Sequence, residues 1–139
     1  MKIAIVLLAL VAAACAAQNG EAWCRCGAFL TYRDTQALAY ELPEITIDYC
    51  DQHNRCKNEC IKALDEFSHY GDLWAMTPEG KTVGQLICEN LTGIDYSGVH
   101  NHRVYGYYEV CGGPWEYTGL ASPDMLCCRE GVQEHCLNY

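Results

Sequence analysis

Cysteine is the residue that most restricts how this chain can fold. The chain contains 11 cysteines in 139 residues, and Cys15 lies in an apolar N-terminal segment that we expect to be removed. The remaining ten are an even number, which in a secreted chain predicts a framework of five disulfides. Their pairing stays open, because ten cysteines allow several hundred connectivities. The expected disulfide cysteines are Cys24, Cys26, Cys50, Cys56, Cys60, Cys88, Cys111, Cys127, Cys128 and Cys136.

The first 17 residues have the pattern of a secretory signal peptide. Lys2 supplies a positive charge, an apolar run covers residues 3–11, and small residues precede the expected cleavage. A membrane anchor is the alternative, but the run is shorter than the roughly 20 residues of a spanning helix. We therefore expect a signal peptide over residues 1–17 and one disulfide-rich, extracellular domain over residues 18–139. No later stretch is apolar enough to span a bilayer, so no transmembrane segment is expected after cleavage.

The segment 46–67 has the periodicity of one amphipathic helix. At about 100° per residue its apolar and cysteine side chains share one arc, and charged or amide side chains fill the opposite arc. Pro43 before the segment and Gly71 after it suit a helix start and stop. Because three cysteines share the apolar arc, we expect the rest of the domain to be cross-linked to this helix. The arc consists of Tyr49, Cys50, His53, Cys56, Cys60, Ile61, Ala63, Leu64 and Phe67.

The segment before this helix combines an extended pattern with a helical one. Residues 23–32 predict a short strand whose Cys24 and Cys26 reach two different partners. Residues 36–41, QALAYE, predict a helical turn.

The segments after the helix predict a second helix and a pair of strands. Residues 82–91 predict a shorter helix with Thr82 as its N-cap. Residues 104–111 are rich in aromatic and β-branched side chains, and residues 115–118 return after a glycine and proline turn, which predicts a hairpin. We therefore expect an α+β fold: a small disulfide-rich secreted domain with a central amphipathic helix, a shorter helix and a C-terminal β-hairpin.

The charge of the chain limits its partners. It has 18 Asp and Glu against 9 Lys and Arg, a formal net charge of −9. Nucleic acids and anionic membranes require clustered positive charge, so neither is expected as a partner. The sequence has no phosphate loop, dinucleotide fingerprint, nucleophile elbow or EF-hand spacing, and we expect no cofactor. The expected partner is an unknown extracellular protein or surface.

His100 and His102 form a weak metal-binding pattern. Two histidines at i,i+2 on a strand face one side and are able to ligate a metal. Two further ligands are needed, for which His69 or His135 are candidates, and oxidised cysteines are excluded. Surface histidines in a loop are the favoured interpretation, so we expect no metal.

Residues 50–56, CDQHNRC, place a histidine between two cysteines. Over these residues the chain resembles the catalytic helix of secreted phospholipase A2, whose motif is C-x-x-H-D-x-C. The resemblance implies a calcium-dependent hydrolase in which His53 is the general base that activates water. Asn54 stands where that family has a calcium-binding aspartate, and the glycine-rich calcium loop does not continue after Gly27. The alternative is that His53 is a buried helix histidine without a catalytic role.

The aromatic residues near the C-terminus are the candidate binding residues. Tyr105, Tyr107, Tyr108 and Trp115 offer large contact area with little rotamer entropy, and packing on the helix is the alternative. Asn90 begins a sequon and is a candidate glycosylation site. No complete catalytic set is visible, so we expect a secreted, non-catalytic binding or structural protein: a receptor ligand, a toxin-like or pheromone-like factor, or a matrix component. The alternative function is a phospholipase A2-like secreted hydrolase, active or degenerate.

Overall fold

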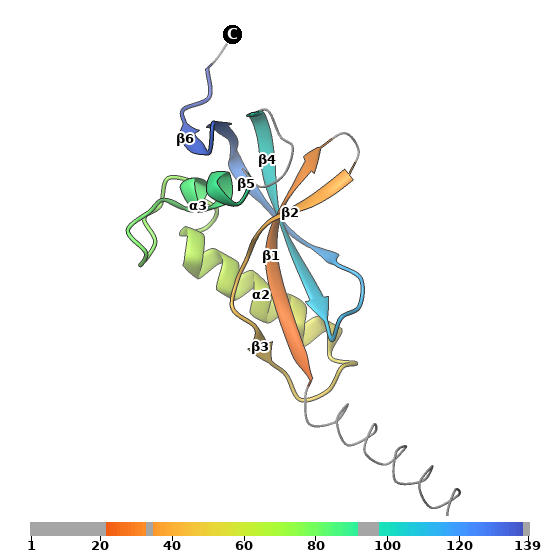
Figure 1. Ribbon diagram of the computed structural model, residues 1–139. Coiled ribbons are helices and arrows are strands. Elements are labelled where there is room, and N and C mark those ends of the chain that lie inside the picture. Colours follow the sequence, from red (N-terminus) through yellow and green to blue (C-terminus); the bar gives the residue numbers. More distant parts are fainter. Residues whose placement is uncertain (1–21, 33–34, 92–97, 138–139) are drawn as a thin grey trace, which may run out of the picture.

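A computed structural model describes residues 22–32, 35–91 and 98–137. Within these residues the chain forms six strands and two helices (Figure 1). The strands are β1 (Trp23–Tyr32), β2 (Thr35–Glu41), β3 (Ile45–Thr46), β4 (Val99–Val110), β5 (Glu116–Arg129) and β6 (Val132–Glu134), and the helices are α2 (His53–Ser68) and α3 (Val83–Leu91). The expected signal peptide, residues 1–17, lies outside the described residues and stays a prediction. No helix in the described part is long and apolar enough to cross a membrane.

A curved antiparallel sheet is the central element of the fold. Its strands follow the order β2-β1-β4-β5-β6, with β3 beside the start of β1, and they form a half-barrel (Figure 1). Helix α2 packs on β1, β4 and β5, and α3 packs on β2, β5 and β6. The mixed α+β class is confirmed, but the expected helix-centred arrangement is wrong. The pairing of β1 with β4 joins segments far apart in the chain, which local periodicity does not reveal.

The second strand corrects another expectation. Residues 36–41, predicted as a helical turn, lie in β2, which pairs with β1 from Gly27 opposite Glu41 to Tyr32 opposite Thr35. Gln, Ala, Leu and Glu favour a helix by only a few tenths of a kcal/mol each, about 0.7 at most. Pairing with a neighbouring strand overrides so small a preference.

Two buried disulfides fix α2 to the inner face of β1. Cys24 pairs with Cys56 and Cys26 pairs with Cys60, and the four residues have 0% exposed surface. Residues two apart on a strand share a face, and residues four apart on a helix share a face. The two bonds therefore lie side by side between one strand and one helix.

Helix α2 starts later than its apolar arc predicts. It begins at His53, and residues 45–46 pair with β1 as β3 instead of belonging to the helix. The side-chain oxygen of Gln52 accepts hydrogen bonds from the backbone N–H groups of Asp48 (3.0 Å) and Tyr49 (3.2 Å), which closes the turn before the helix. A third disulfide, Cys50–Cys111, joins this turn to the end of β4.

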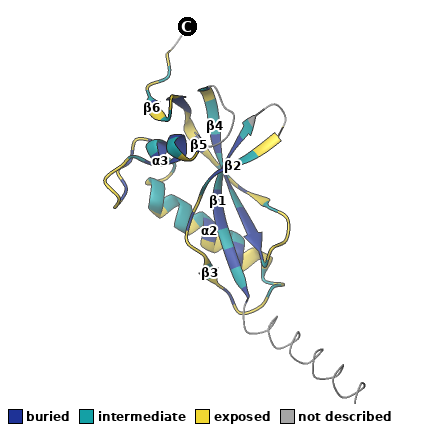
Figure 2. Cartoon of the chain, in the orientation of Figure 1, coloured by how far each residue is buried: buried dark blue, intermediate teal, exposed yellow. Residues whose placement is uncertain are grey.

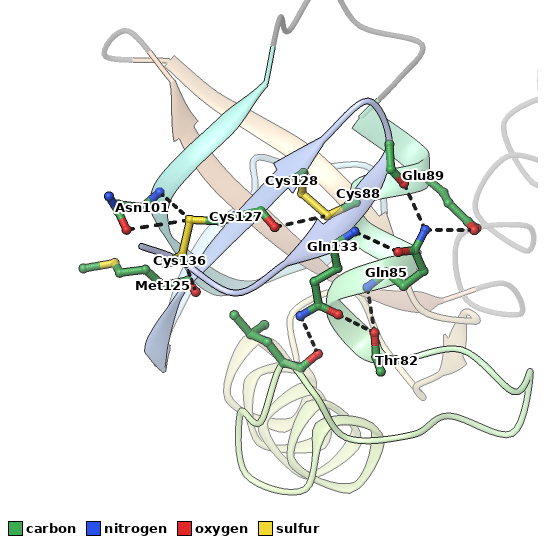
Figure 3. Close-up of a disulfide and its surroundings, with 12 residues drawn as sticks. Thr82, Gln85, Cys88, Glu89, Asn101, Met125, Cys127, Cys128, Gln133 and Cys136 are labelled. Atoms are coloured by element: carbon green, nitrogen blue, oxygen red, sulfur yellow. Dashed lines mark hydrogen bonds between the residues drawn. A yellow bond between two sulfur atoms is a disulfide. The ribbon is translucent and has the colours of Figure 1, made fainter. Parts of the chain in front are cut away.

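Helix α3 begins within one residue of its predicted start and is bonded to β5. The Thr82 hydroxyl accepts a hydrogen bond from the backbone N–H of Gln85 (3.1 Å), as an N-cap does. Cys88 of α3 pairs with Cys128, beside a fifth disulfide between Cys127 and Cys136 (Figure 3). All ten expected cysteines are thus paired.

Gln133 of β6 forms hydrogen bonds with α3 and with the loop that precedes α3 (Figure 3). Its side-chain N–H donates to the carbonyl of Leu73 (3.1 Å), and its side-chain oxygen accepts from the Thr82 hydroxyl. Its backbone N–H donates to the side-chain oxygen of Gln85 (2.8 Å). These three hydrogen bonds hold β6 against α3 and against the loop before α3.

The predicted hairpin exists, but as two long strands of the main sheet. β4 and β5 cover residues 99–110 and 116–129, well beyond the predicted 104–111 and 115–118. The ladder between them is irregular, and near Ser122 the backbone N–H of Val104 donates to the serine hydroxyl (3.0 Å). The strand β5 is hard to predict from the sequence because it contains residues typical of turns, namely Gly119, Ser122 and Pro123.

The core lies on the inner face of the sheet, which carries both helices (Figure 2). One part of it surrounds α3 and includes Ile87, Val104 and Leu126. The other surrounds the two disulfides of α2 and includes Tyr108 and Val110. The opposite face of the sheet is left without a helix in the described part of the chain.

Candidate functional site

The outer face of the sheet carries a cluster of aromatic side chains. On β4, Tyr108 is buried in the core beside α2, and a Cβ at Gly106 would lie 2.8 Å from Leu64 of that helix. Side chains alternate along a strand, so Tyr105 and Tyr107 point to the opposite side. The residues that meet there are Phe29 from β1, Tyr105 and Tyr107 from β4, and Trp115 and Tyr117 from the β4–β5 connection and β5. We call these five residues the outer aromatic face.

The rings of this face form one continuous set of contacts. The Phe29 ring centre lies 4.7 Å from that of Tyr107 and 5.1 Å from that of Trp115. Tyr117 lies 5.5 Å from Tyr107 and 5.8 Å from Tyr105. Tilted and edge-on pairs at such distances are favourable beyond the area that they bury. The rings therefore fix one another in place.

Exposure grades from the centre of the face to its edge. Phe29 is 5% exposed, whereas Tyr117 is 46% exposed. Tyr105, Tyr107 and Trp115 are half-buried. The face is thus an apolar platform with an accessible rim.

Gly27 allows side chains of the outer aromatic face to pack directly over the β1 backbone. A Cβ at this position would lie 2.9 Å from Leu38 Cδ1, 3.2 Å from the Phe29 ring and 3.4 Å from the Trp115 ring. A glycine inside a strand often marks such a close approach. Leu38, which is 39% exposed, extends the apolar surface over β2.

A charged group borders the face on β1. The Arg25 guanidinium lies 4.5 Å from the centre of the Trp23 ring, and its Nε lies 3.3 Å from the Glu41 carboxylate. Arg25 also stands opposite Glu109 in the β1–β4 register. Stacking on an aromatic ring holds a guanidinium in a fixed orientation.

The structure brings together three of the four predicted binding residues. Tyr105, Tyr107 and Trp115 belong to the outer aromatic face, whereas Tyr108 is 8% exposed on the inner face. The alternation of a strand separates Tyr107 from Tyr108, and the sequence contains that signal. Phe29 was not predicted, since its place depends on the pairing of β1 with β4.

His53 lies at the first position of α2 and is exposed. It does not line the cavity between α2 and the sheet, nor the three surface hollows beside α2 and β6. A general base must lie within hydrogen-bond reach of the proton that it takes in a bound substrate. The role implied by the resemblance to phospholipase A2 therefore gains no support from the surroundings of His53, and the expectation that it is buried is wrong.

The histidines of the weak metal pattern point to different neighbours. The Nδ1 atom of His102 lies 3.1 Å from the carbonyl oxygen of Thr31, whereas His100 is exposed and lines a shallow cavity with His135. His135 stacks on Trp74, with ring centres 4.1 Å apart. Among the described residues the one group of three close potential metal ligands is Cys24, Cys56 and Cys60, whose sulfurs are oxidised.

Comparisons of the chain with protein-family models, with curated proteins and with solved structures find no match.

Proposed function

We propose that this chain is an extracellular, non-catalytic binding protein whose outer aromatic face contacts another protein. The observation that carries the proposal is the continuous aromatic platform on the helix-free side of the sheet. Tyr, Trp, Phe and Arg are enriched at the centres of protein interfaces. Aromatic side chains held by their neighbours lose little entropy on binding, which favours affinity.

The disulfide framework supports the extracellular location. Five disulfides join α2 to β1 twice, the turn before α2 to the residue after β4, α3 to β5, and β5 to the segment after β6. Such frameworks persist in oxidising compartments and are rare in the cytosol. Together with the expected signal peptide, they favour secretion. Asn90 is exposed on α3, which lies on the inner side of the sheet, so a glycan there leaves the outer aromatic face free.

The charge of the chain indicates the character of the partner surface. The chain carries a net charge of −9, and Glu41, which stands opposite Gly27 in the β1–β2 register, is exposed beside the face. Complementary charge raises the rate of association and excludes wrong partners. The partner surface is therefore expected to be apolar at its centre and basic at its rim.

Site-directed photo-cross-linking tests this proposal. A benzophenone amino acid replaces Tyr117 on the face or, as the matched control, Tyr49, which is 58% exposed in the turn before α2. Each protein is incubated in the extracellular fluid of its source, and the product is identified by mass spectrometry. We expect a discrete cross-linked protein from position 117 and none from position 49.

Alanine variants then measure the affinity of the purified pair. Tyr117→Ala and Trp115→Ala should each weaken binding about 30-fold, as truncation of an aromatic interface residue does at about 2 kcal/mol. Tyr49→Ala should bind like the wild type. The proposal fails if all three variants bind alike, or if the two cross-linking positions capture the same proteins.

A further inference from the structure

We infer that the space between the C-terminal end of α2 and the inner face of the sheet is a binding site for an unbranched alkyl chain. The structure contains a cavity of about 80 Å³ at this place. It lies on the α2 side of the sheet, and Tyr105 of the outer aromatic face also lines it. The inference rests on the cavity alone and does not depend on the proposed protein partner.

The walls of the cavity come from every layer of the fold. Leu64 and Phe67 of α2 form one side, Ile87 of α3 closes one end, and Val104 of β4 forms the floor. Ile87 is 1% exposed, so this end is deep in the core. Phe67 stacks on Tyr40, with ring centres 5.4 Å apart, and both rings line the cavity.

The two serine hydroxyls of the lining already have partners within the protein. The Ser68 hydroxyl donates to the Leu64 carbonyl (2.6 Å) and accepts from the backbone N–H of Gly71 (2.8 Å). The Ser122 hydroxyl accepts from the N–H of Val104 (3.0 Å) and donates to the carbonyl of Asp124 (2.7 Å). No buried side-chain nitrogen or oxygen in the described residues lacks a partner. The two serine hydroxyls therefore have no unused bond for a polar ligand, and water gains little in an apolar cavity.

The open end of the cavity lies where α2 stops. Tyr70, which is 82% exposed, and Gly71 line it on the helix side, and the exposed Ala121 lines it on β5. His69, Tyr70 and Gly71 have successive positive φ angles of 46°, 66° and 92°, which turn the chain sharply away from the helix axis. This turn leaves the end of the cavity open to solvent.

Size and charge decide the chemical class of the ligand. An apolar cavity of about 150 Å³ holds benzene, so a space of about 80 Å³ has too little volume for a ring and suits a single chain. The half-buried Asp65 also lines the cavity, near Tyr70 at its open end. Its carboxylate disfavours an anionic head group. The ligand is therefore an alkyl chain with an uncharged or zwitterionic head.

Methyl NMR on the wild-type protein tests this inference. The probes are 1-butanol, 1-hexanol and 1-octanol, with 1,6-hexanediol as the polar match and octanoate as the anionic match. We expect saturable shifts of the methyl signals of Leu64, Ile87 and Val104. Val132 and Leu137, which are 58% and 59% exposed, serve as control signals and should not move. The dissociation constant should fall about fourfold per added CH₂ until the chain fills the cavity.

Two variants that fill the cavity provide a second test of the alkyl-chain site. Ala28 lines the cavity from β1, and Ala28→Leu should weaken 1-octanol binding about tenfold or more by occupying its place. Ala63 lines a neighbouring groove and not the cavity, so Ala63→Leu is the matched control and should bind normally. Val104→Ile adds one methyl group and replaces Ala28→Leu if that variant does not fold. Octanoyl lysophosphatidylcholine below its micelle concentration shows whether a lipid-borne chain also enters.

The possible NMR results either support or contradict the alkyl-chain site. Shifts confined to the cavity methyls and lost in the filled variant support the site, whether the free alcohol or the lipid binds better. The inference is wrong if 1-octanol shifts no cavity methyl up to its solubility limit. It is also wrong if the control methyls shift equally, or if a folded cavity-filling variant binds as the wild type does.

Discussion

Tyr108 is a buried tyrosine whose hydroxyl group faces a carboxylate. The hydrogen bond to Glu116 raises the pKa of Tyr108 above its ordinary value of 10.0, and burial and the negative charge of Glu116 raise it further. The folded chain therefore holds this proton more tightly than the unfolded chain does. The resulting stability is fully present below about pH 10, the unfolded pKa, and is lost as the pH rises through the raised folded pKa.

Replacement of this tyrosine should change both the stability and its pH dependence. Tyr108→Phe removes the hydrogen bond and should lower the free energy of unfolding by about 1 kcal/mol at about pH 8. Above about pH 10 the free energy of unfolding should also decrease less steeply with pH than in the wild type. The reason is that the variant lacks the Tyr108 hydroxyl, which holds its proton more tightly in the folded state. Denaturant unfolding at several pH values measures both effects. Tyr49→Phe, on the surface, is the control, and equal alkaline slopes in wild type and Tyr108→Phe would contradict this account.

The spacing of four cysteines contains more information than their number. Cys24 and Cys26 share one face of β1, and Cys56 and Cys60 share one face of α2. The prediction that the two strand cysteines have different partners is right, but those partners belong to one helix. Two cysteines that are two residues apart on a strand can pair with two cysteines that are four residues apart on a helix. Recognising this correspondence could have reduced the number of possible disulfide pairings. Residues such as Phe29 offer no comparable local signal.

At the scale of elements, the side chains between α3 and β6 are closely packed. A Cβ at Gly84 would lie 2.1 Å from the side-chain nitrogen of Gln133, so any larger residue here would displace the buried Gln133 amide. Glycine costs up to about 1 kcal/mol relative to alanine inside an exposed helix. The close contact with Gln133 therefore reverses the usual preference.

A double-mutant cycle tests this packing. Gly84→Ala alone should destabilise the protein by about 1–3 kcal/mol, because the new methyl group displaces Gln133 from its hydrogen bonds. In a Gln133→Ala background the same substitution should cost much less, since the clash is gone. Chemical unfolding of the four proteins gives the coupling energy. Additive effects would show that Gly84 and Gln133 do not constrain each other.

Local patterns identified some elements well and others poorly. The helix over 82–91 and the end of the helix over 46–67 were predicted within one or two residues, because amphipathic periodicity is a local property. The strand over 36–41 was missed because its pairing with β1, and not its composition, decides its conformation. The length of β5 was missed because Pro123 and Gly119 resemble a turn.

At the scale of the whole molecule, the disulfides and the sheet divide the protein into two sides. The inner side carries both helices, the buried core and the apolar cavity. The outer side carries the aromatic platform. Because α2 is bonded twice to β1, the inner side is covered and the outer side is left for a partner. The sidedness of the sheet is the physical basis of the proposed function.

A disulfide map of the oxidised protein tests this sidedness most directly. Trypsin cleaves after Arg25, which separates Cys24 from Cys26, and after Lys57, which separates Cys56 from Cys60. Mass spectrometry of the unreduced digest should find the Cys24 peptide joined to the Cys56 peptide and the Cys26 peptide joined to the Cys60 peptide. A strand cysteine joined to Cys88, Cys111 or a C-terminal cysteine would detach α2 from the inner face and contradict the account.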